Sequence, residues 1–444
     1  MRFFCARSAT VSMLTGAIML ASLAGTLGAQ DPGRPSLLPL PPLPSAPVGA
    51  GVSRTAATDS LWGQPEPSPI PQVAPPGAEI MGPQYYEAMK GGYEGGCTTC
   101  TSGACAPVGC HNQYVYANAL LMTHVKQGGF VPGIDSVTGN AELFFCQPEF
   151  NNLWHGGFEI GTGWCFGCNC NNALEAVYWG IYPATGSALA RGSLNSTIDF
   201  GDLTYDGANA NTFYTNSTIQ EVRYGFNFHS LETNIVGNGL CGGPFGCGQC
   251  GCCLGQSGSP WGFGWTAGFR YINFSEQFLY RADTADFDFN GDPTELNYGM
   301  GLNNNLFGFQ LGGGLSYCVS DSLSGYAIAK FGIYDNWVTT SQTVYGTQGR
   351  AVINNGPFVG DEFDVRSDDN VFSCAGQFDL GGRYAINNDW SMNFGWRVMA
   401  LSGVAISEVN VIDDQFQNVN GIASQQTTGS FIMHGGYVGA TYCW

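Results

Sequence analysis

The chain has 444 residues, of which only 11% are charged and 13% are aromatic, and 65 glycines are spread along it. Soluble domains carry about 25% charged residues, so this composition favours a protein wall that faces lipid. The formal net charge of −19 argues against a nucleic acid as partner, because affinity for phosphates comes from Lys and Arg.

The N-terminus is typical of a secretory signal peptide. Arg2 and Arg7 supply positive charge, residues 11–27 are apolar, and Ala29 is the small residue before the expected cleavage site. We therefore expect residues 1–29 to be removed on export. No later apolar run in the sequence reaches the 18 residues of a transmembrane helix, so a mature chain that spans a membrane must do so as a closed barrel.

Proline marks the next part of the chain. Fifteen of the 22 prolines fall between Asp31 and Pro107, and such a composition predicts an extended, disordered arm rather than a core. We assign residues 30–90 to this arm, which we expect in the periplasm. A Gly- and Cys-rich segment, residues 91–112, follows it, and residues 113–444 form the predicted outer-membrane barrel domain.

Seventeen cysteines are unusual for a protein of a reducing compartment. After a signal peptide, disulfides in loops are the favoured interpretation of the clusters, with metal binding or a thioredoxin-like redox role as alternatives. Their connectivity does not follow from the sequence. The disulfide candidates are Cys97, Cys100, Cys105, Cys110, Cys165, Cys168, Cys170, Cys241, Cys247, Cys250, Cys252 and Cys253.

From residue 113 onward, short runs alternate between apolar and polar residues and are separated by Gly, Asn and Asp, the pattern of strands and turns. In residues 261–274, Trp261, Trp265 and Phe269 share one face while Arg270 lies on the other. Residues 221–233, 306–318 and 390–400 repeat this division. Each run is about as long as the 9 to 11 residues with which a tilted strand crosses a bilayer.

The predicted fold is an all-β, transmembrane, antiparallel up-and-down barrel of about twelve strands, within a range of ten to sixteen. The other candidate strands are residues 114–123, 154–164, 174–182, 213–219, 323–334, 371–384 and 430–444, with weaker runs near Phe278 and Val338. Residues 282–305 and 348–370 are expected to be long outer loops.

The last strand ends on an aromatic residue, as in a barrel-closing strand. Val438, Ala440, Tyr442 and Trp444 share one face, which we predict to point outward. This C-terminal signal predicts the barrel assembly machinery and outer-membrane lipid as partners.

Three segments carry a family resemblance. They are Tyr-Ala-Asn-Ala-Leu-Leu-Met at residues 116–122, Gly-Phe-Arg-Tyr-Ile at residues 268–272 with Glu276, and Asn-Asn-Leu-Phe-Gly-Phe-Gln-Leu-Gly at residues 304–312. On these segments the chain resembles the planctomycete beta-barrel porin family that is number seven in its series. The resemblance implies a barrel in the outer membrane, and it carries no substrate or catalytic residue to this chain.

Charged residues inside the predicted strands are expected to point into the lumen, because Arg or Lys at the bilayer midplane costs about 2–4 kcal/mol. One interpretation is a ladder of interior ion pairs that closes or stiffens a small barrel. The other is a charged constriction that selects ions or small solutes. The predicted lumen ladder is Arg223, Arg270, Arg383, Arg397, Glu159, Glu175, Glu221 and Asp379.

One acidic stretch offers oxygen ligands at alternate positions. Asp286, Asp288, Asn290 and Asp292 match the first half of a calcium loop. The twelfth position is Asn297 rather than Glu, and no helical pattern flanks the stretch. The acidic end of a strand that enters an outer loop is therefore preferred over calcium, and we predict no cofactor.

Catalytic constellations are sparse. His155 with Glu159 and His229 with Glu232 could each pair as acid and base, but neither pair has a nucleophile at a recognisable spacing. We therefore do not expect an enzyme.

The leading functional hypothesis is a monomeric outer-membrane barrel that acts as a passive, cation-favouring channel for small solutes or as a structural envelope protein. The alternative is a secreted, disulfide-stapled surface or adhesion protein whose β-domain is soluble and has no pore.

Overall fold

The computed structural model describes residues 113–125, 130–143, 154–166, 172–237, 260–387, 389–412, 414–424 and 426–444, which all belong to one compact unit. The predicted signal peptide, the Pro-rich arm, the Gly- and Cys-rich segment and the candidate disulfide cysteines lie outside these residues, except for the backbone of Cys165. Among the described residues, no helix is long and apolar enough to cross a membrane.

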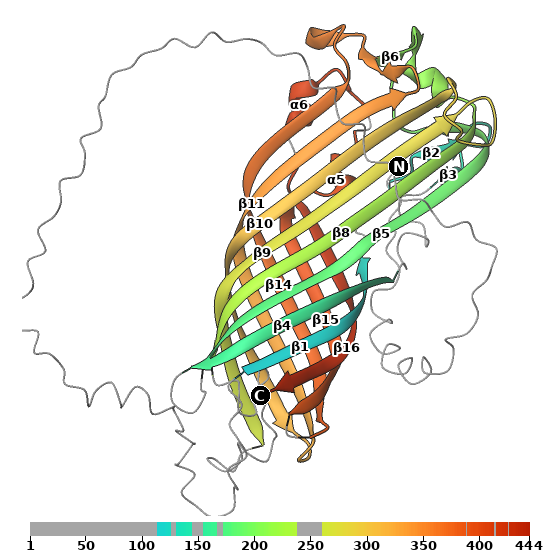
Figure 1. Ribbon diagram of the computed structural model, residues 1–444. Helices are drawn as coiled ribbons and strands as arrows, with labels where there is room; N and C mark the ends of the chain where they lie inside the picture. The colour runs from blue at the N-terminus through green and yellow to red at the C-terminus, as the bar shows by residue number, and fades with distance from the viewer. Residues whose placement is uncertain are drawn as a thin grey trace, which may run out of the picture. The chain divides into compact units, whose positions relative to one another are not determined.

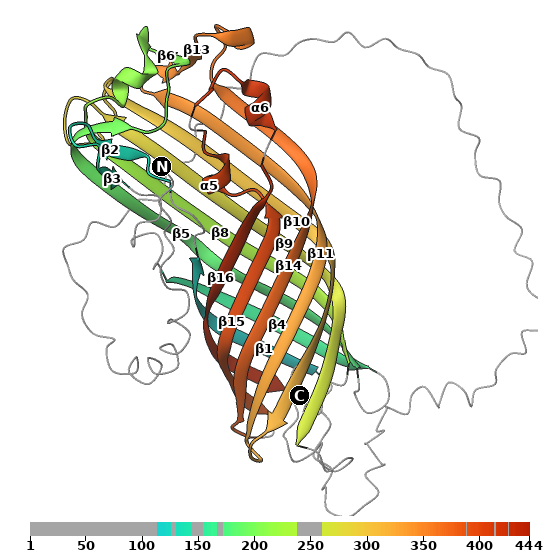
Figure 2. The ribbon, with the colours of Figure 1, turned by 180° about the vertical axis from the view of Figure 1, so that it is seen from behind.

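Ten long strands in the described ranges form a closed antiparallel barrel (Figures 1 and 2). They are β1 (Gln113–Val125), β4 (His155–Phe166), β5 (Asn172–Ser196), β8 (Ser217–Gly237), β9 (Trp261–Asp283), β10 (Glu295–Cys318), β11 (Leu323–Gly346), β14 (Asp364–Ala385), β15 (Trp390–Val404) and β16 (Gly429–Cys443). Each pairs with the next one along the chain, so the predicted up-and-down topology is confirmed.

The barrel closes through the two ends of the strand order. β1 pairs with β16 from Tyr114 opposite Cys443 to Val125 opposite Ile432. This closure satisfies the backbone groups that an open sheet edge would leave unpaired in lipid.

Ten strands lie within the predicted range but below the best count of twelve. The alternation predicts two strands at residues 213–219 and 221–233, whereas residues 217–237 form the single strand β8. The weaker runs near Phe278 and Val338 lie inside β9 and β11. Residues 295–305 and 364–370, expected in loops, begin β10 and β14.

These corrections have one cause, which is that the strands are longer than a membrane crossing. The six strands β5, β8, β9, β10, β11 and β14 contain 21 to 25 residues each. A tilted strand needs about 9 to 11 residues to cross the hydrocarbon core. About half of each of these strands therefore extends beyond the bilayer.

Polarity inverts along each long strand, as β10 illustrates. Phe307, Leu311 and Tyr317 point outward and are exposed, whereas further up the strand the outward residues include Asn303 and Asn297. From Phe307 to Tyr317 the strand rises by ten residues of about 3.3 Å each. Because the strand is tilted by about 40° from the barrel axis, this stretch gives an apolar band about 25 Å tall. That height matches the lipid-facing band of an outer-membrane barrel.

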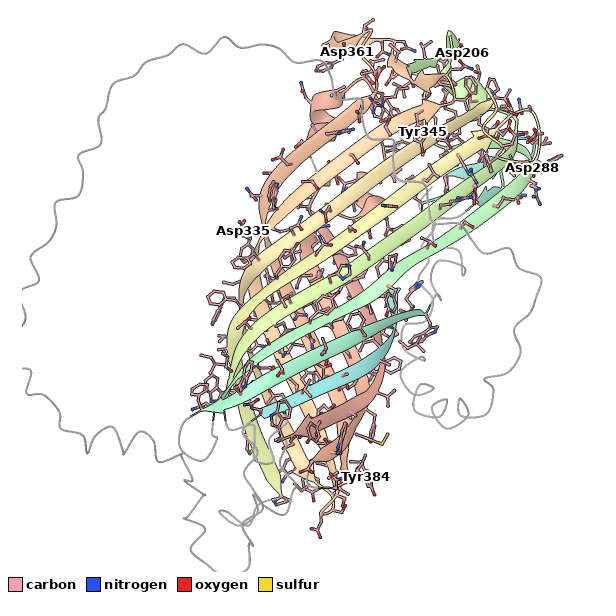
Figure 3. The ribbon with its side chains drawn as sticks, in the orientation of Figure 1. Asp206, Asp288, Asp335, Tyr345, Asp361 and Tyr384 are labelled. Atoms are coloured by element: carbon pink, nitrogen blue, oxygen red, sulfur yellow. The ribbon has the colours of Figure 1, made fainter. Side chains whose placement is uncertain are left out.

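Aromatic residues edge this band at both levels, as in the aromatic girdles of membrane barrels. Tyr271, Phe307, Trp337 and Phe372 are exposed at its upper edge. Trp261 and Tyr384 lie at the lower edge. The ring centroids of Trp261 and Tyr317 are 4.7 Å apart, and Tyr384 is labelled near the bottom of Figure 3.

Among the connections that the structure describes, the short ones lie at one end of the barrel and the longer ones at the other; residues 238–259, between the lower ends of β8 and β9, lie outside the described residues. Residues 319–322 and 386–389 link strands at the lower end, where the C-terminus also lies (Figure 1). The longer connections lie at the upper end and hold β2 (Gly133–Asp135), β3 (Ala141–Leu143), β6 (Leu203–Tyr205), β7 (Ala208–Asn209), η3 (Ala210–Phe213), β12 (Gly349–Arg350), β13 (Val352–Ile353), η4 (Gly356–Phe358), α5 (Ser407–Asn410) and α6 (Val419–Ala423). Bacterial barrels place short turns in the periplasm and long loops outside.

Candidate functional site

The interior of the barrel differs between its upper and lower halves. In the upper half the inward side chains are apolar and packed: Phe274, Tyr298, Met399 and Phe431 are each at most 3% exposed. The Phe274 and Phe431 rings lie 4.2 Å apart. This half contains a hydrophobic core where an open porin would contain water.

The connection between β15 and β16 closes the core from above. Asn304 on β10 donates from Nδ2 to the carbonyl of Ala405 (2.9 Å) and accepts from the Ala405 N–H at Oδ1 (2.9 Å). Glu276 on β9 accepts from the N–H and the hydroxyl of Ser407, at 2.5 and 2.8 Å. Phe416, fully buried, stacks 5.0 Å from Phe200 of the β5–β8 connection. Two long connections thus fold into the mouth of the barrel.

The lower half contains a polar cavity of about 90 Å³, lined by side chains of β1, β4, β5, β11, β14, β15 and β16. This volume suffices for a few water molecules. Charged side chains on its wall are arranged in two clusters.

The first cluster is centred on Arg397 of β15. Its guanidinium pairs with Asp379 of β14 at 2.5 Å and with Glu159 of β4. Glu159 also accepts a hydrogen bond from Asn118 (3.0 Å), and Asp379 accepts one from Gln377 (2.7 Å). All the charges in this cluster are therefore paired within the barrel wall.

The second cluster is centred on Glu232 of β8. Its carboxylate pairs with Arg270 of β9 (3.4 Å) and Lys330 of β11 (2.8 Å). Gln310 and Asn234 each donate an amide hydrogen to it as well, at 2.7 and 3.1 Å. Four neighbouring strands are thereby cross-linked through one carboxylate.

Trp179 of β5 lies between the two clusters. The guanidinium carbons of Arg397 and Arg270 lie 5.1 and 5.8 Å from its ring centroid, within the range of cation–π attraction. The ring is fully buried, so it occupies the space between the two ion-pair clusters.

Tyrosines fill much of the remaining space because glycines lie beside them. Tyr114 donates to Glu175 at 2.6 Å. A Cβ atom on Gly163 or on Gly161 would overlap the rings of Tyr114 and Tyr116, respectively. Part of the glycine content therefore serves to let aromatic rings lie across a narrow interior.

The structure places six of the eight predicted ladder residues inside the barrel: Arg270, Arg383, Arg397, Glu159, Glu175 and Asp379. The prediction for Arg223 and Glu221 is wrong. They lie on the outer face of β8, where they pair with each other at 2.8 Å, and Glu221 also pairs with Arg281. The reason is the polarity inversion, because this part of β8 extends above the membrane and its apolar face, with Val222 and Phe226, is the inner one.

Two charged interior residues, Glu232 and Lys330, are absent from the predicted lumen ladder. Glu232 was considered only as a partner for His229, but it points inward, whereas His229 points outward and is hydrogen-bonded to Tyr178 at 2.8 Å. Lys330 lies in a predicted strand and was not assigned to the lumen. The alternation of β8 and β11 would have identified both, once the inner face was known.

The other predicted residues are also located. Asp286 and Asp292 converge, but with Asp283, whereas Asp288 is not part of the group. The Asn290 side chain donates from Nδ2 to Oδ2 of Asp286 at 3.5 Å. In β16, Val438, Ala440 and Tyr442 alternate with the inward Tyr437 and Thr441, and Trp444 follows on the outward face of the strand.

A closed antiparallel barrel with a lipid-facing apolar band, two aromatic girdles and, behind that band, charged side chains that face the interior defines an integral outer-membrane β-barrel protein. The family model described as "Putative beta barrel porin-7" matches residues 154–444, more than half of the chain. The chain therefore belongs to this family. The segment 116–122, which contributed to the resemblance, precedes the matched residues.

Comparisons with other known proteins add no functional assignment. No curated protein sequence matches the chain. Among solved structures, it is similar to the outer membrane protease OmpT of Escherichia coli, with 12% identity, a TM-score of 0.35, and coverage of 78% of this chain and 100% of the other. It is also similar to a major outer membrane protein of Thermus thermophilus, with 11% identity, a TM-score of 0.29, and coverage of 75% and 100%. At these values neither likeness informs the function.

Proposed function

We propose that this protein is a closed structural barrel of the outer membrane, which presents its folded upper end to the exterior and does not conduct solutes passively. The observation that carries the proposal is the packed interior, apolar above and ion-paired below. An eight-stranded barrel is just wide enough for side chains to fill, whereas porins of 16 to 18 strands leave an aqueous channel. Ten strands are close to the filled limit.

The interior charges also argue against a cation-favouring passage. In the lower half, Arg270, Lys330, Arg383 and Arg397 provide four positive charges, and Glu159, Glu175, Glu232 and Asp379 provide four negative ones. Glu276 adds one negative charge in the upper half. The excess of acids in the whole chain is thus not concentrated in the lower half of the barrel interior. The ion pairs of Arg270, Lys330 and Arg397 favour the interpretation that the ladder stiffens the barrel.

The way the chain enters the barrel supports a periplasmic N-terminal arm. Gln113, the first residue of β1, donates its backbone N–H to the carbonyl of Trp444 at 3.1 Å, at the end with the short turns. Because short turns are periplasmic in bacterial barrels, the preceding residues would continue on that side.

Recording from planar bilayers tests the proposal. The purified protein, with its barrel confirmed by heat-modifiable migration on gels, is expected to give no single-channel steps under conditions in which a 16-stranded porin conducts. Resolvable steps from the folded wild-type protein would overturn the closed barrel.

A second variant tests what closes the barrel. Replacing residues 407–424 with a short Gly-Ser linker removes α5, α6 and Phe416 from the mouth. Conductance of this variant alone would assign the closure to the β15–β16 connection, whereas silence of both proteins would assign it to the strand side chains. Extraction of wild-type protein from washed envelopes only by detergent is expected, because the apolar band requires lipid; release by washing alone would favour a secreted protein.

A further inference from the structure

Three carboxylates meet where β9 leaves the barrel and turns into β10. Asp283 is the last residue of β9, and Asp286 and Asp292 lie in the connection that follows it. One carboxylate oxygen from each residue lies within 4.8 Å of those of the other two. Three negative charges at this separation repel one another unless a cation or protons lie between them.

Asp283 supplies the observation that distinguishes this group from an ordinary acidic loop. The residue is fully buried. Its Oδ1 accepts hydrogen bonds from the Ala285 N–H and the Thr294 hydroxyl, both at 2.8 Å. Within the described part of the chain, its Oδ2 has no hydrogen-bond donor. A buried carboxylate oxygen without a partner is costly, and a bound cation removes that cost.

The side chains that could neutralise the group are engaged elsewhere. Arg281, two residues before Asp283, pairs with Glu221, and its guanidinium carbon lies 3.8 Å from the Phe289 ring centroid. Among the described residues, no Lys or Arg forms an ion pair with Asp283, Asp286 or Asp292. Backbone N–H groups of the same loop donate to Asp286 Oδ1 and Asp292 Oδ1, at 2.8 Å each, but no ion pair within the described residues compensates the negative charge of the three carboxylates.

We propose that Asp283, Asp286 and Asp292 bind one calcium ion at the outer end of the barrel. Carboxylate oxygens are the hard ligands that Ca²⁺ prefers, and its six to eight positions tolerate flexible geometry and water. Mg²⁺ requires near-ideal octahedral geometry and keeps most of its water, so three loop carboxylates suit it less well.

The surroundings assign this ion a structural role. The carbonyls of Asp283 and Asp286 accept hydrogen bonds from the Thr218 hydroxyl at the start of β8. The carbonyl of Asp292 accepts one from Thr347, which follows β11, at 3.3 Å. A cation between the three carboxylates would hold the β9–β10 connection against both strands.

Calcium binding to the purified barrel in a neutral detergent tests the site directly. Flow dialysis with radioactive calcium is expected to give one ion per chain, with a dissociation constant of roughly 0.1–1 mM, the range of extracellular modules. Asp286→Asn and Asp292→Asn should each weaken binding by more than about tenfold. Asp283→Asn should do the same, and the other two variants preserve the test if this buried substitution prevents folding.

Asp288→Asn is the matched control, because Asp288 has the same charge in the same loop but lies outside the group, exposed at the upper end of the barrel (Figure 3). It is expected to bind calcium like the wild type. Calcium should also raise the temperature at which the barrel unfolds on gels, in the wild type and Asp288→Asn only. The proposal is overturned by absence of binding at millimolar calcium, by equal weakening in Asp288→Asn, or by equal affinity for magnesium.

Discussion

Replacing Arg397 with methionine tests whether the interior ion pairs stabilise the barrel. The arginine side chain is 8% exposed and lies between Asp379 and Glu159, whose side chains are each 4% exposed. Methionine fills much of the same volume but leaves two carboxylates without a positive partner. Removing one member of a buried ion pair costs about 3–5 kcal/mol of unfolding free energy.

The remaining contacts of the two carboxylates favour the lower end of that range. Glu159 keeps the hydrogen bond from Asn118, and Asp379 keeps the one from Gln377. We therefore expect Arg397→Met to lose about 3 kcal/mol. Arg350→Met is the control, because the Arg350 pairs with Glu362 and Asp364 are partly exposed to solvent, and such a pair contributes at most about 1 kcal/mol.

Equilibrium unfolding in urea, followed by tryptophan fluorescence in lipid vesicles, measures the loss of unfolding free energy in Arg397→Met and in Arg350→Met. A third variant, which combines Arg397→Met with Glu159→Gln and Asp379→Asn, should recover most of the lost stability, since no buried charge stays unpaired. If Arg397→Met is no less stable than Arg350→Met, or if the triple variant recovers nothing, the ion-pair reasoning is refuted.

Three further predictions follow from the same structure. Leu311→Arg, in the middle of the lipid-facing band, should lower the free energy of unfolding by about 2–4 kcal/mol. Asn303→Arg, on the same face but above the band, should change it by less than about 0.5 kcal/mol. Equal losses of the two variants in urea unfolding would contradict the polarity inversion. Asn304→Ala removes both hydrogen bonds to Ala405 and should cost about 1–3 kcal/mol, with faster hydrogen exchange of the Ala405 amide as the readout. Hydrogen bonds from the Thr138 backbone and hydroxyl and the Val137 backbone lower the pKa of Asp135 below its ordinary 3.8. The stabilisation they give is thus fully present above that ordinary value and is lost as pH falls through the lower folded pKa; a carboxyl titration by NMR at or above 3.8 would disprove it.

Alternation in the sequence was sufficient to predict a membrane barrel. On β9 and β15, Trp261, Phe269 and Trp390 face outward, and Arg270 and Arg397 face inward, as the period of two indicates. Those segments lie within the bilayer, where lipid outside and protein inside assign one polarity to each face. In these segments the alternation of apolar and polar residues therefore identifies which face of the strand points inward.

The same pattern failed where the strands leave the membrane. In β8, alternation divided Val222 and Tyr224 from Glu221 and Arg223 correctly, but it assigned the wrong face to the interior. Two faces can be read from a period of two, but which face is inside depends on whether water or lipid surrounds the strand. That depends on how far each strand extends, and no local pattern encodes it.

The candidate sites divide in the same way. The sequence determined which residue types could face the interior and that Asp286 and Asp292 were potential ligands. Only the tertiary structure brought Asp283 to them in place of Asp288, joined Glu159, Asp379 and Arg397 from three strands, and filled the interior with a packed core. The physical reason is that side-chain direction follows from local backbone geometry, whereas the neighbours of a side chain depend on the register and number of strands in the closed barrel.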